Sequence, residues 1–316
     1  MKSKLLKCIA KWIPMLLGIF LVWYSFAKLS SEDVAEIIKS IQEANYFWIL
    51  LSVLMGFISH LFRALRWKLS LAPLGYKAST KNSLIAVFIG YLVNIVLPRA
   101  GEFSRAAAIN QTEKIPGDQA LGTIISERII DLFMLGLVIG LAIWVQSAAI
   151  NEIVQAKIPN QIGPIVWLGI IIIGFGLWFV FKSKNKTILK LRGFIEGVWK
   201  GLCSIWKLEY KWAYLFYSLM IWALYIGMFY VATRALSDTE NIGLSAVLTG
   251  FLAGTFSIAA TNGGIGSYPI AIQKSLELYG VPAISGLSFG WIMWSTQTLM
   301  MIVLGGLSFL FLKQKN

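Results

Sequence analysis

Charged residues are scarce in this chain. Asp, Glu, Lys and Arg make up 14% of its 316 residues, against about 25% in ordinary soluble domains. Apolar residues make up 57%, and the mean hydropathy is +0.71. These values exclude a soluble globular protein and an intrinsically disordered one. The chain also has only two cysteines, which excludes a scaffold held together by disulfides.

Residues that commonly carry enzyme chemistry are equally rare. His60 is the single histidine, and the sequence has no Cys-x-x-Cys pair, no cluster of His and Cys, and no nucleotide-binding motif. We therefore expect no metal, no cofactor and no enzyme activity. His60 itself has two interpretations: a packed histidine near the membrane interface, or a member of a proton relay.

Long apolar runs are what the sequence has instead. A helix needs about 20 apolar residues to cross a hydrocarbon core of ~30 Å. Six runs reach or approach that length: 8–27, 46–62, 122–146, 164–181, 212–234 and 284–312. They predict an all-α integral membrane protein that forms a single polytopic domain over 1–316. For the first run, a cleaved signal peptide that ends in Ser25-Phe26-Ala27 is the alternative.

Two further apolar stretches are interrupted. Segment 82–110 is broken at Pro98 and Gly101, and segment 243–279 is broken at Asn262-Gly263-Gly264. The second half of each has about 10 to 13 residues, or ~15–20 Å of helix, which is too short to span the membrane. We interpret both segments as re-entrant helical hairpins, which enter and leave the membrane on the same side.

The basic residues orient these segments. The chain has 28 Lys and Arg against 15 Asp and Glu, a net charge of +13. With the N-terminus inside, 23 basic residues fall on the inner side and five on the outer side. This bias predicts a multi-pass protein of the cell inner (cytoplasmic) membrane with both termini in the cytoplasm. Cys8 and Cys203 then face a reducing compartment and form no disulfide. A soluble basic face that would suit nucleic acid is absent from the sequence.

The two halves of the chain follow one plan. Residues 1–146 give span, span, hairpin, span, starting inside, and residues 164–312 give the same order starting outside. We therefore predict an inverted-topology repeat, as in many transporters, with the first hairpin on the cytoplasmic side and the second on the exterior side. A constant offset of 163 residues aligns Phe88 with Phe251 and Gly101 with Gly264.

Each half also contains a connector with an amphipathic pattern. Segment 187–207 is basic and suits the inner leaflet, whereas its counterpart 31–43 is shorter, acidic and outside. The alternative is that both are plain connectors, because amphipathic patterns are common in such segments.

The tip of the first hairpin combines a helix start with basic side chains. Pro98 is expected to end the entering helix, and Gly101 to allow a tight reversal. The exiting helix then presents unpaired N–H groups, which bind anions, and arginines add fork-shaped donors that suit phosphate. Glu102 and Arg105 are i,i+3 neighbours and are placed to pair. The candidate substrate-binding residues here are Asn94, Arg99, Gly101, Glu102 and Arg105.

The tip of the second hairpin repeats this arrangement. Ser267 is expected to cap the exiting helix, and Pro269 suits its first turn. Its N-terminus points to mid-bilayer from the opposite side, so we expect the two helix N-termini to converge where inverted-repeat transporters bind substrate. The candidate residues of this tip are Asn262, Gly263, Gly264, Ser267 and Tyr268.

A third candidate element is the helix that follows Pro116. Glu127 lies eleven residues after Pro116, or about 16 Å along the helix axis, near mid-bilayer, and Arg128 and Asp131 follow it. Each ionisable residue at that depth costs roughly 3 kcal/mol, so the three must face a polar cavity or pair with charges of the first hairpin. They are therefore candidates for substrate binding, and the competing hypothesis is a buried knot of ion pairs that only fixes the hairpin.

These motifs resemble the flippase-like membrane domain of the lysyl-phosphatidylglycerol synthase/flippase proteins and its free-standing bacterial and archaeal relatives. The resemblance extends along essentially the whole chain. It rests on Asn94…Pro98-Arg99-Ala100-Gly101-Glu102…Arg105, Glu127-Arg128…Asp131 and Gly263-Gly264-Ile265-Gly266. The last motif departs from the family pattern, in which a proline precedes the glycines and an acidic residue follows them. The resemblance implies movement of a lipid or a lipid-linked group between leaflets. Because the chain stops at Asn316, four residues after its last span, we expect no synthase activity.

Four hypotheses follow for the function. The first is a flippase or scramblase-type transporter of a phospholipid or polyprenyl-phosphate-linked lipid, whose anionic head group is held between the hairpin tips. The second is a secondary transporter of a soluble solute, coupled to H⁺ or Na⁺. An intramembrane enzyme and a membrane scaffold are the remaining two. The expected partner is a membrane lipid, and the 13 tryptophans are as compatible with a homodimer as with lipid anchoring.

Overall fold

The computed structural model describes residues 18–27, 29–97, 100–157, 208–261 and 263–313, and for 148–157 only the backbone. These ranges contain helices and no strand, which confirms the all-helical prediction. The helices are Gly18–Ala27, α2 Ser31–Glu43, α3 Tyr46–Leu71, η1 Ala72–Leu74, α4 Thr80–Val96, α5 Gly101–Glu113, α6 Gly117–Lys157, α9 Lys211–Thr233, α10 Ser237–Glu240, α11 Leu244–Ala260, α12 Ser267–Glu277 and α13 Ala283–Lys313.

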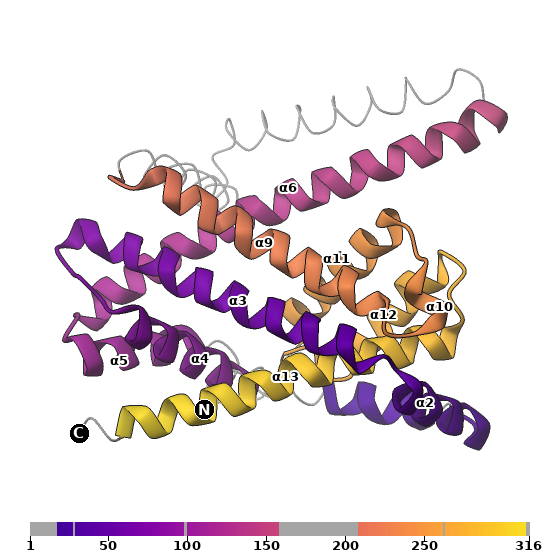
Figure 1. Cartoon of the computed structure of the whole chain (residues 1–316), viewed down its shortest axis with the longest axis horizontal. Helices are drawn as coiled ribbons and strands as arrows, with labels where there is room; N and C mark the ends of the chain where they lie inside the picture. The colour runs from indigo at the N-terminus through magenta and orange to yellow at the C-terminus, as the bar shows by residue number, and fades with distance from the viewer. Residues whose placement is uncertain (1–17, 28, 98–99, 158–207, 262, 314–316) are drawn as a thin grey trace, which may run out of the picture. The chain divides into compact units, whose positions relative to one another are not determined.

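The chain divides into two compact units. The first consists of residues 1–127 and 212–316, and the second of residues 128–211. The first unit contains α2 to α5, the start of α6, and the helices from α9 onward (Figure 1). The second unit contains the rest of α6.

Four helices are long and apolar enough to cross a membrane. They are Tyr46–Leu74, Gly117–Ser147, Lys211–Thr233 and Ala283–Leu312. Each coincides with one of the six predicted spans. The first predicted span is described only from Gly18 onward, and the span 164–181 and the amphipathic segment 187–207 lie outside the described residues. The total of six spans therefore stays a prediction. The connector predicted at 31–43 is helix α2.

Helix α3 is longer than the apolar run that predicted it. The prediction ended the span at Phe62 and placed Arg63 and Arg66 among the inner segments, but α3 continues to Leu71. Both arginines are buried inside the protein and have polar partners within the fold. The predicted helix end was too early because a buried arginine with a polar partner does not interrupt a helix, while the side of the membrane on which both residues lie stays a prediction.

Helices α4 and α5 form the hairpin predicted at 82–110, and they lie side by side in Figure 1. They run antiparallel, because Asn94 contacts Gly101 near the tip while Asn82 donates a 2.6 Å hydrogen bond to Glu113 at the open end. The helices approach closely at Gly90, where an added Cβ would lie 3.0 Å from the carbonyl oxygen of Gly101. This is a helical hairpin by geometry, and its re-entrant character stays a prediction.

Helices α11 and α12 form the second hairpin, and α13 contacts both hairpins. Toward its C-terminal end, Gly305 of α13 packs on Leu92 of α4. Nearer its start, Gly290 packs on Pro269 of α12. Helix α13 therefore joins the two hairpins within the first unit.

The two hairpins have similar dimensions. Helices α4 and α11 have 17 residues each, and α5 and α12 have 13 and 11. The offset of 163 residues moves the start of α4 at Thr80 to position 243, one residue before the start of α11. The repeat itself and the opposite membrane orientation of its halves stay predictions.

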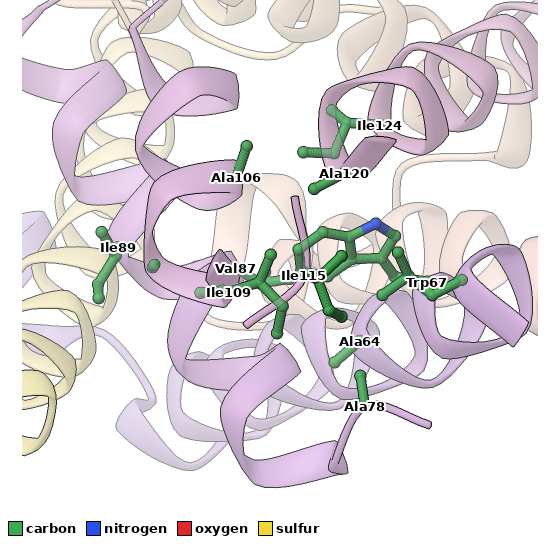
Figure 2. Close-up of a cluster of buried hydrophobic side chains, with 13 residues drawn as sticks. Ala64, Trp67, Ala78, Val87, Ile89, Ala106, Ile109, Ile115, Ala120 and Ile124 are labelled. Carbon is green, nitrogen blue, oxygen red and sulfur yellow. The ribbon is translucent and has the colours of Figure 1, made fainter. Parts of the chain in front are cut away.

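A buried apolar cluster fixes the first hairpin against its neighbours. The cluster lies around the indole of Trp67 and contains side chains from α3, α4, α5 and α6 (Figure 2). Its members include Ala64, Trp67, Val87, Ala106, Ile109, Ile115, Ala120 and Ile124. Small alanines on α5 and α6 let these helices approach the tryptophan. Complete burial of Trp67 stabilises this packing by roughly 3–5 kcal/mol, by comparison with substitutions of buried aromatic residues by alanine in other proteins. The charged residues of the candidate site lie on the same helices.

Candidate functional site

Arg105 and Glu127 form a buried ion pair. Nη1 of Arg105 lies 2.8 Å from Oε2 of Glu127, and their side chains are 6% and 1% exposed. Helix α5 carries the arginine and the first-unit part of α6 carries the glutamate. The sequence predicted that mid-helix charges of α6 either face a polar cavity or pair with the first hairpin, and the structure brings this pair together. The distance is typical of a charge-assisted hydrogen bond.

A second arginine reaches the same carboxylate. Nε of Arg66 lies 3.4 Å from Oε1 of Glu127, and the Arg66 side chain is fully buried. Its Nη1 donates a 3.1 Å hydrogen bond to Ser218 of α9. Sequence reasoning missed Arg66 because this residue follows the end of the apolar run and was counted among the inner segments. The signal was present, since Ser52, Ser59 and Arg66 are seven residues apart and share one helix face.

Trp67 positions both charged helices. Its ring lies under the guanidinium of Arg105, 3.8 Å from the guanidinium carbon, in a cation–π contact. Its Nε1 donates a 2.9 Å hydrogen bond to the hydroxyl of Thr123, one turn before Glu127. One indole therefore sets the relative positions of α5 and the start of α6. We call Arg66, Arg105 and Glu127 the buried charge cluster.

The first tip is held by a contact that the sequence did not predict. Oδ1 of Asn94 accepts a 2.7 Å hydrogen bond from the backbone N–H of Gly101, so the side chain satisfies one of the free donors at the start of α5. Gly101 does not serve the reversal: it is the first residue of α5, and a Cβ there would overlap Gly90 and Asn94. Close packing of α4 and α5 requires this glycine. Glu102 is half-buried on α5, and Arg99 lies outside the described residues.

The second tip is a glycine turn closed by hydroxyl groups. Gly263, Gly264 and Gly266 all have positive φ, between 65° and 77°, a conformation that favours glycine. Ser267 is the first residue of α12, and Gly266 is its N-cap. The predicted cap was therefore displaced by one residue, because the hydroxyl of Ser267 bonds Ser257 and Thr261 across the hairpin, at 2.7 Å each.

Three candidate residues of this tip remain, Gly263, Tyr268 and Asn262. Nε1 of Trp294 donates a 2.8 Å hydrogen bond to the carbonyl of Gly263. Tyr268 is buried against Gly254 of α11. Asn262 lies outside the described residues.

Arg128 and Asp131 belong to the second unit. They form an i,i+3 pair on α6, with Nη1 of Arg128 3.8 Å from Oδ2 of Asp131. The arginine side chain is 45% exposed, so this pair is weaker than the one between Arg105 and Glu127.

Comparison with known proteins agrees with the helical architecture. Residues 11–306 match the family described as the lysylphosphatidylglycerol synthase TM region. A UPF0104 membrane protein of Methanocaldococcus jannaschii is 25% identical over 279 residues, which cover 78% of this chain and 79% of that protein. No solved structure matches the chain. Because the family match includes both hairpins and the buried charge cluster, the chain belongs to the family of the lysylphosphatidylglycerol synthase TM region and is a membrane protein.

Proposed function

We propose that this protein is a lipid flippase or scramblase-type transporter of the inner membrane, which moves a phosphate-bearing lipid between leaflets. One observation carries the proposal: the guanidinium groups of Arg66 and Arg105 converge on a single buried carboxylate, Glu127. The three side chains together carry one more positive than negative charge.

The chemistry of this cluster suits a phosphate group. A guanidinium offers two parallel donors to phosphate oxygens, and two such groups side by side match a tetrahedral anion. In a membrane-spanning chain, each buried charge costs at least about 3 kcal/mol. A lipid phosphate that exchanges with Glu127 would use donors that the fold already holds in place.

The hairpins supply the second line of support. Both contact α13, at Trp294 for the second tip and at Gly305 for the first hairpin. These positions are about three helical turns, or roughly 16 Å, apart on α13. In the proposal both hairpins are re-entrant and their tips converge on the head group, with acyl chains in the surrounding lipid. Further proposed contacts within the first unit are Asn94, Glu102 and Tyr268, and Arg99 and Asn262 are proposed from the sequence alone.

The test is lipid movement in reconstituted liposomes. Fluorescent phosphatidylglycerol, phosphatidylcholine and a polyprenyl phosphate are compared for the wild type, Arg105→Lys and Glu127→Gln. Arg105→Lys keeps the charge but loses the planar fork, so we expect lipid movement to fall by about tenfold or more, the value of one charge-assisted hydrogen bond. Arg234→Lys is the matched control, because Arg234 is exposed and stacks on Trp48 and Tyr230 away from the cluster.

Three outcomes separate the hypotheses. Lipid movement that both cluster variants abolish, in protein that remains folded at the assay temperature, supports the proposal and ranks the head groups. If Arg105→Lys moves lipid at the wild-type rate, the buried charge cluster has a structural role only. Folded wild-type protein that moves none of the three lipids overturns the proposal. A soluble-solute transporter is then tested by uptake and by native mass spectrometry of retained ligands.

A further inference from the structure

One face of α3 is polar along most of its length and buried. Ser52, Ser59, His60, Arg63 and Arg66 are all buried inside the first unit. The last four lie 7, 8, 11 and 14 residues after Ser52, so the five side chains occupy one sector of the helix. From Ser52 to Arg66 the helix rises about 21 Å, which is two thirds of a ~30 Å hydrocarbon core. We call these five residues the polar face of α3.

Polar side chains of other helices line this face. Gln297 of α13 contacts Ser52, with 3.5 Å between Nε2 and Oγ. Tyr225 of α9 contacts Arg63, with 3.3 Å between Oη and Nη2. Ser218, two turns earlier on α9, contacts Arg66. Polar contacts with other helices are therefore present at both ends of this face, at Ser52 and at Arg63 and Arg66, and do not end at the buried charge cluster.

His60 and Arg63 form the centre of this face. Each residue is only 4% exposed. The His60 ring lies 4.6 Å from the ring of Tyr91 and 6.3 Å from that of Tyr225, measured between centroids. Within the described part of the chain, Nδ1 of His60 is buried without a hydrogen-bond partner. A buried imidazole nitrogen without a partner is unfavourable, and a ligand that forms a hydrogen bond to it would remove this penalty.

The chemistry of these side chains is that of an anion site. A guanidinium donates two parallel hydrogen bonds to phosphate oxygens, a phenol hydroxyl donates a third, and an imidazole N–H a fourth. Arg63 precedes Arg66 by three residues, or about 4.5 Å of helix rise. A phosphate held at one arginine is therefore within reach of the other.

We propose that His60, Arg63 and Tyr225 form a second phosphate station, distinct from the buried charge cluster, and that the polar face of α3 is the path between leaflets. The inference rests on the proposed function and deepens it, because it gives the moving head group a route as well as a binding site. The ligand is recognised through its phosphate, carried by a lipid or by a soluble phosphoester.

The experiment uses the full chain in phosphatidylcholine vesicles with a trace of fluorescent phosphatidylglycerol. Arg63→Lys and Tyr225→Phe are compared with the wild type and with Arg234→Lys. Tyr225→Phe removes a single hydroxyl and keeps the ring that packs against His60, so it tests the station without disturbing the fold. A neutral fluorescent glycolipid without phosphate serves as the second probe. We expect phosphatidylglycerol movement to fall about tenfold in Arg63→Lys, and several-fold in Tyr225→Phe. Glycolipid movement is expected to be equal in all four proteins.

The outcomes distinguish the second station from the proposed function. If the wild type moves phosphatidylglycerol, Arg105→Lys stops it, and both station variants move it at the wild-type rate, the station is overturned and the proposed function stands. If the variants slow both probes equally, phosphate recognition at the station is overturned. If the folded wild type moves neither lipid, the proposed function itself fails. Glycerol 3-phosphate added outside the vesicles tests whether the phosphate of a soluble phosphoester also binds at the station. If it inhibits lipid movement by the wild type but not by Tyr225→Phe, the phosphate binds at the station.

Discussion

The guanidinium carbon of Arg105 lies 3.8 Å from the centroid of the Trp67 ring. The contact connects the first hairpin to α3, and Nη1 of the same guanidinium lies 2.8 Å from Oε2 of Glu127. A stacked arginine loses less conformational freedom when it binds an anion than one that extends freely from a helix. The site is therefore organised before any ligand enters it.

Trp67 contributes through both its ring and its N–H. In Trp67→Phe a ring stays beneath Arg105, but Thr123 loses its donor, so we expect the free energy of unfolding to fall by about 1–3 kcal/mol. In Trp67→Ala the ring is also lost, and the expected fall is about 3–5 kcal/mol. Thermal melting in detergent micelles measures both. Equal losses in the two variants would contradict a separate role for the ring.

The three members of the buried charge cluster depend on one another. Glu127→Gln leaves two arginines buried without this carboxylate, and we expect a loss of about 3–5 kcal/mol of stability. In the double variant Arg66→Gln/Glu127→Gln, the loss of stability should be smaller than the sum of the two single losses by about 0.5–3 kcal/mol. The reason is that the double variant no longer contains the Arg66 charge, which Glu127→Gln alone leaves without this carboxylate. A double-mutant cycle on melting temperatures measures this coupling. Additive losses would show that Arg66 and Glu127 act independently.

Gly101 is required by close packing. A Cβ at Gly101 would overlap the backbone of Gly90 and the side chain of Asn94, so Gly101→Ala is expected to separate the tips of α4 and α5 and to cost more than about 3 kcal/mol. Gly306→Ala on α13 is the matched control, since nothing lies within 4 Å of a Cβ there. The control should be neutral or stabilising by about 0.5–1 kcal/mol. Melting temperatures of the two variants check the prediction, which a stable Gly101→Ala would overturn.

The N-terminus of α2 should respond to acid. Ser30 and Asp33 form a capping box, and the hydrogen bonds from Ser30 lower the pKa of the Asp33 carboxyl below its ordinary value of 3.8. Because the pKa is lowered in the folded state, the cap stabilises α2 above pH 3.8, and this contribution is lost as the pH falls through the folded pKa.

Hydrogen exchange of residues 31–36 checks this dependence, with rates normalised to the intrinsic rate at each pH. Protection should decrease between pH 5 and pH 3 by more than in the rest of the first unit. Asp33→Asn should remove most of the pH dependence because the titrating carboxyl is gone, whereas Glu36→Gln, one turn further along α2, should keep it. A decrease of the same size in Asp33→Asn would contradict the assignment to the cap.

Hydropathy predicted most of the helices because a helix that crosses a membrane requires a long run of apolar residues. It gave the pairing of Glu127 with the first hairpin as one of two outcomes, since a charge in the middle of an apolar helix needs either a polar cavity or a partner. The same reasoning failed for Arg66. A charge near the end of an apolar run has two outcomes, a loop or a buried partner, and hydropathy alone does not distinguish them. The spacing of Ser52, Ser59 and Arg66 on one face would have done so.

The turns were harder to predict than the spans. Gly101 was assigned to a reversal, yet its role depends on how near Gly90 comes from another helix. Ser267 was assigned to a cap, yet its hydroxyl bonds two residues of the opposite arm. Both errors concern contacts between segments that are distant in sequence. Local propensity contains no information about them.

Helix α13 is a single rod of 31 residues that touches the second tip at Trp294 and the first hairpin at Gly305. Because the helix is continuous between these two contacts, a tilt of α13 about one of them displaces the other. A motion of α13 that loosens its contact with the second tip therefore also shifts α4, so the two hairpins are coupled through this helix.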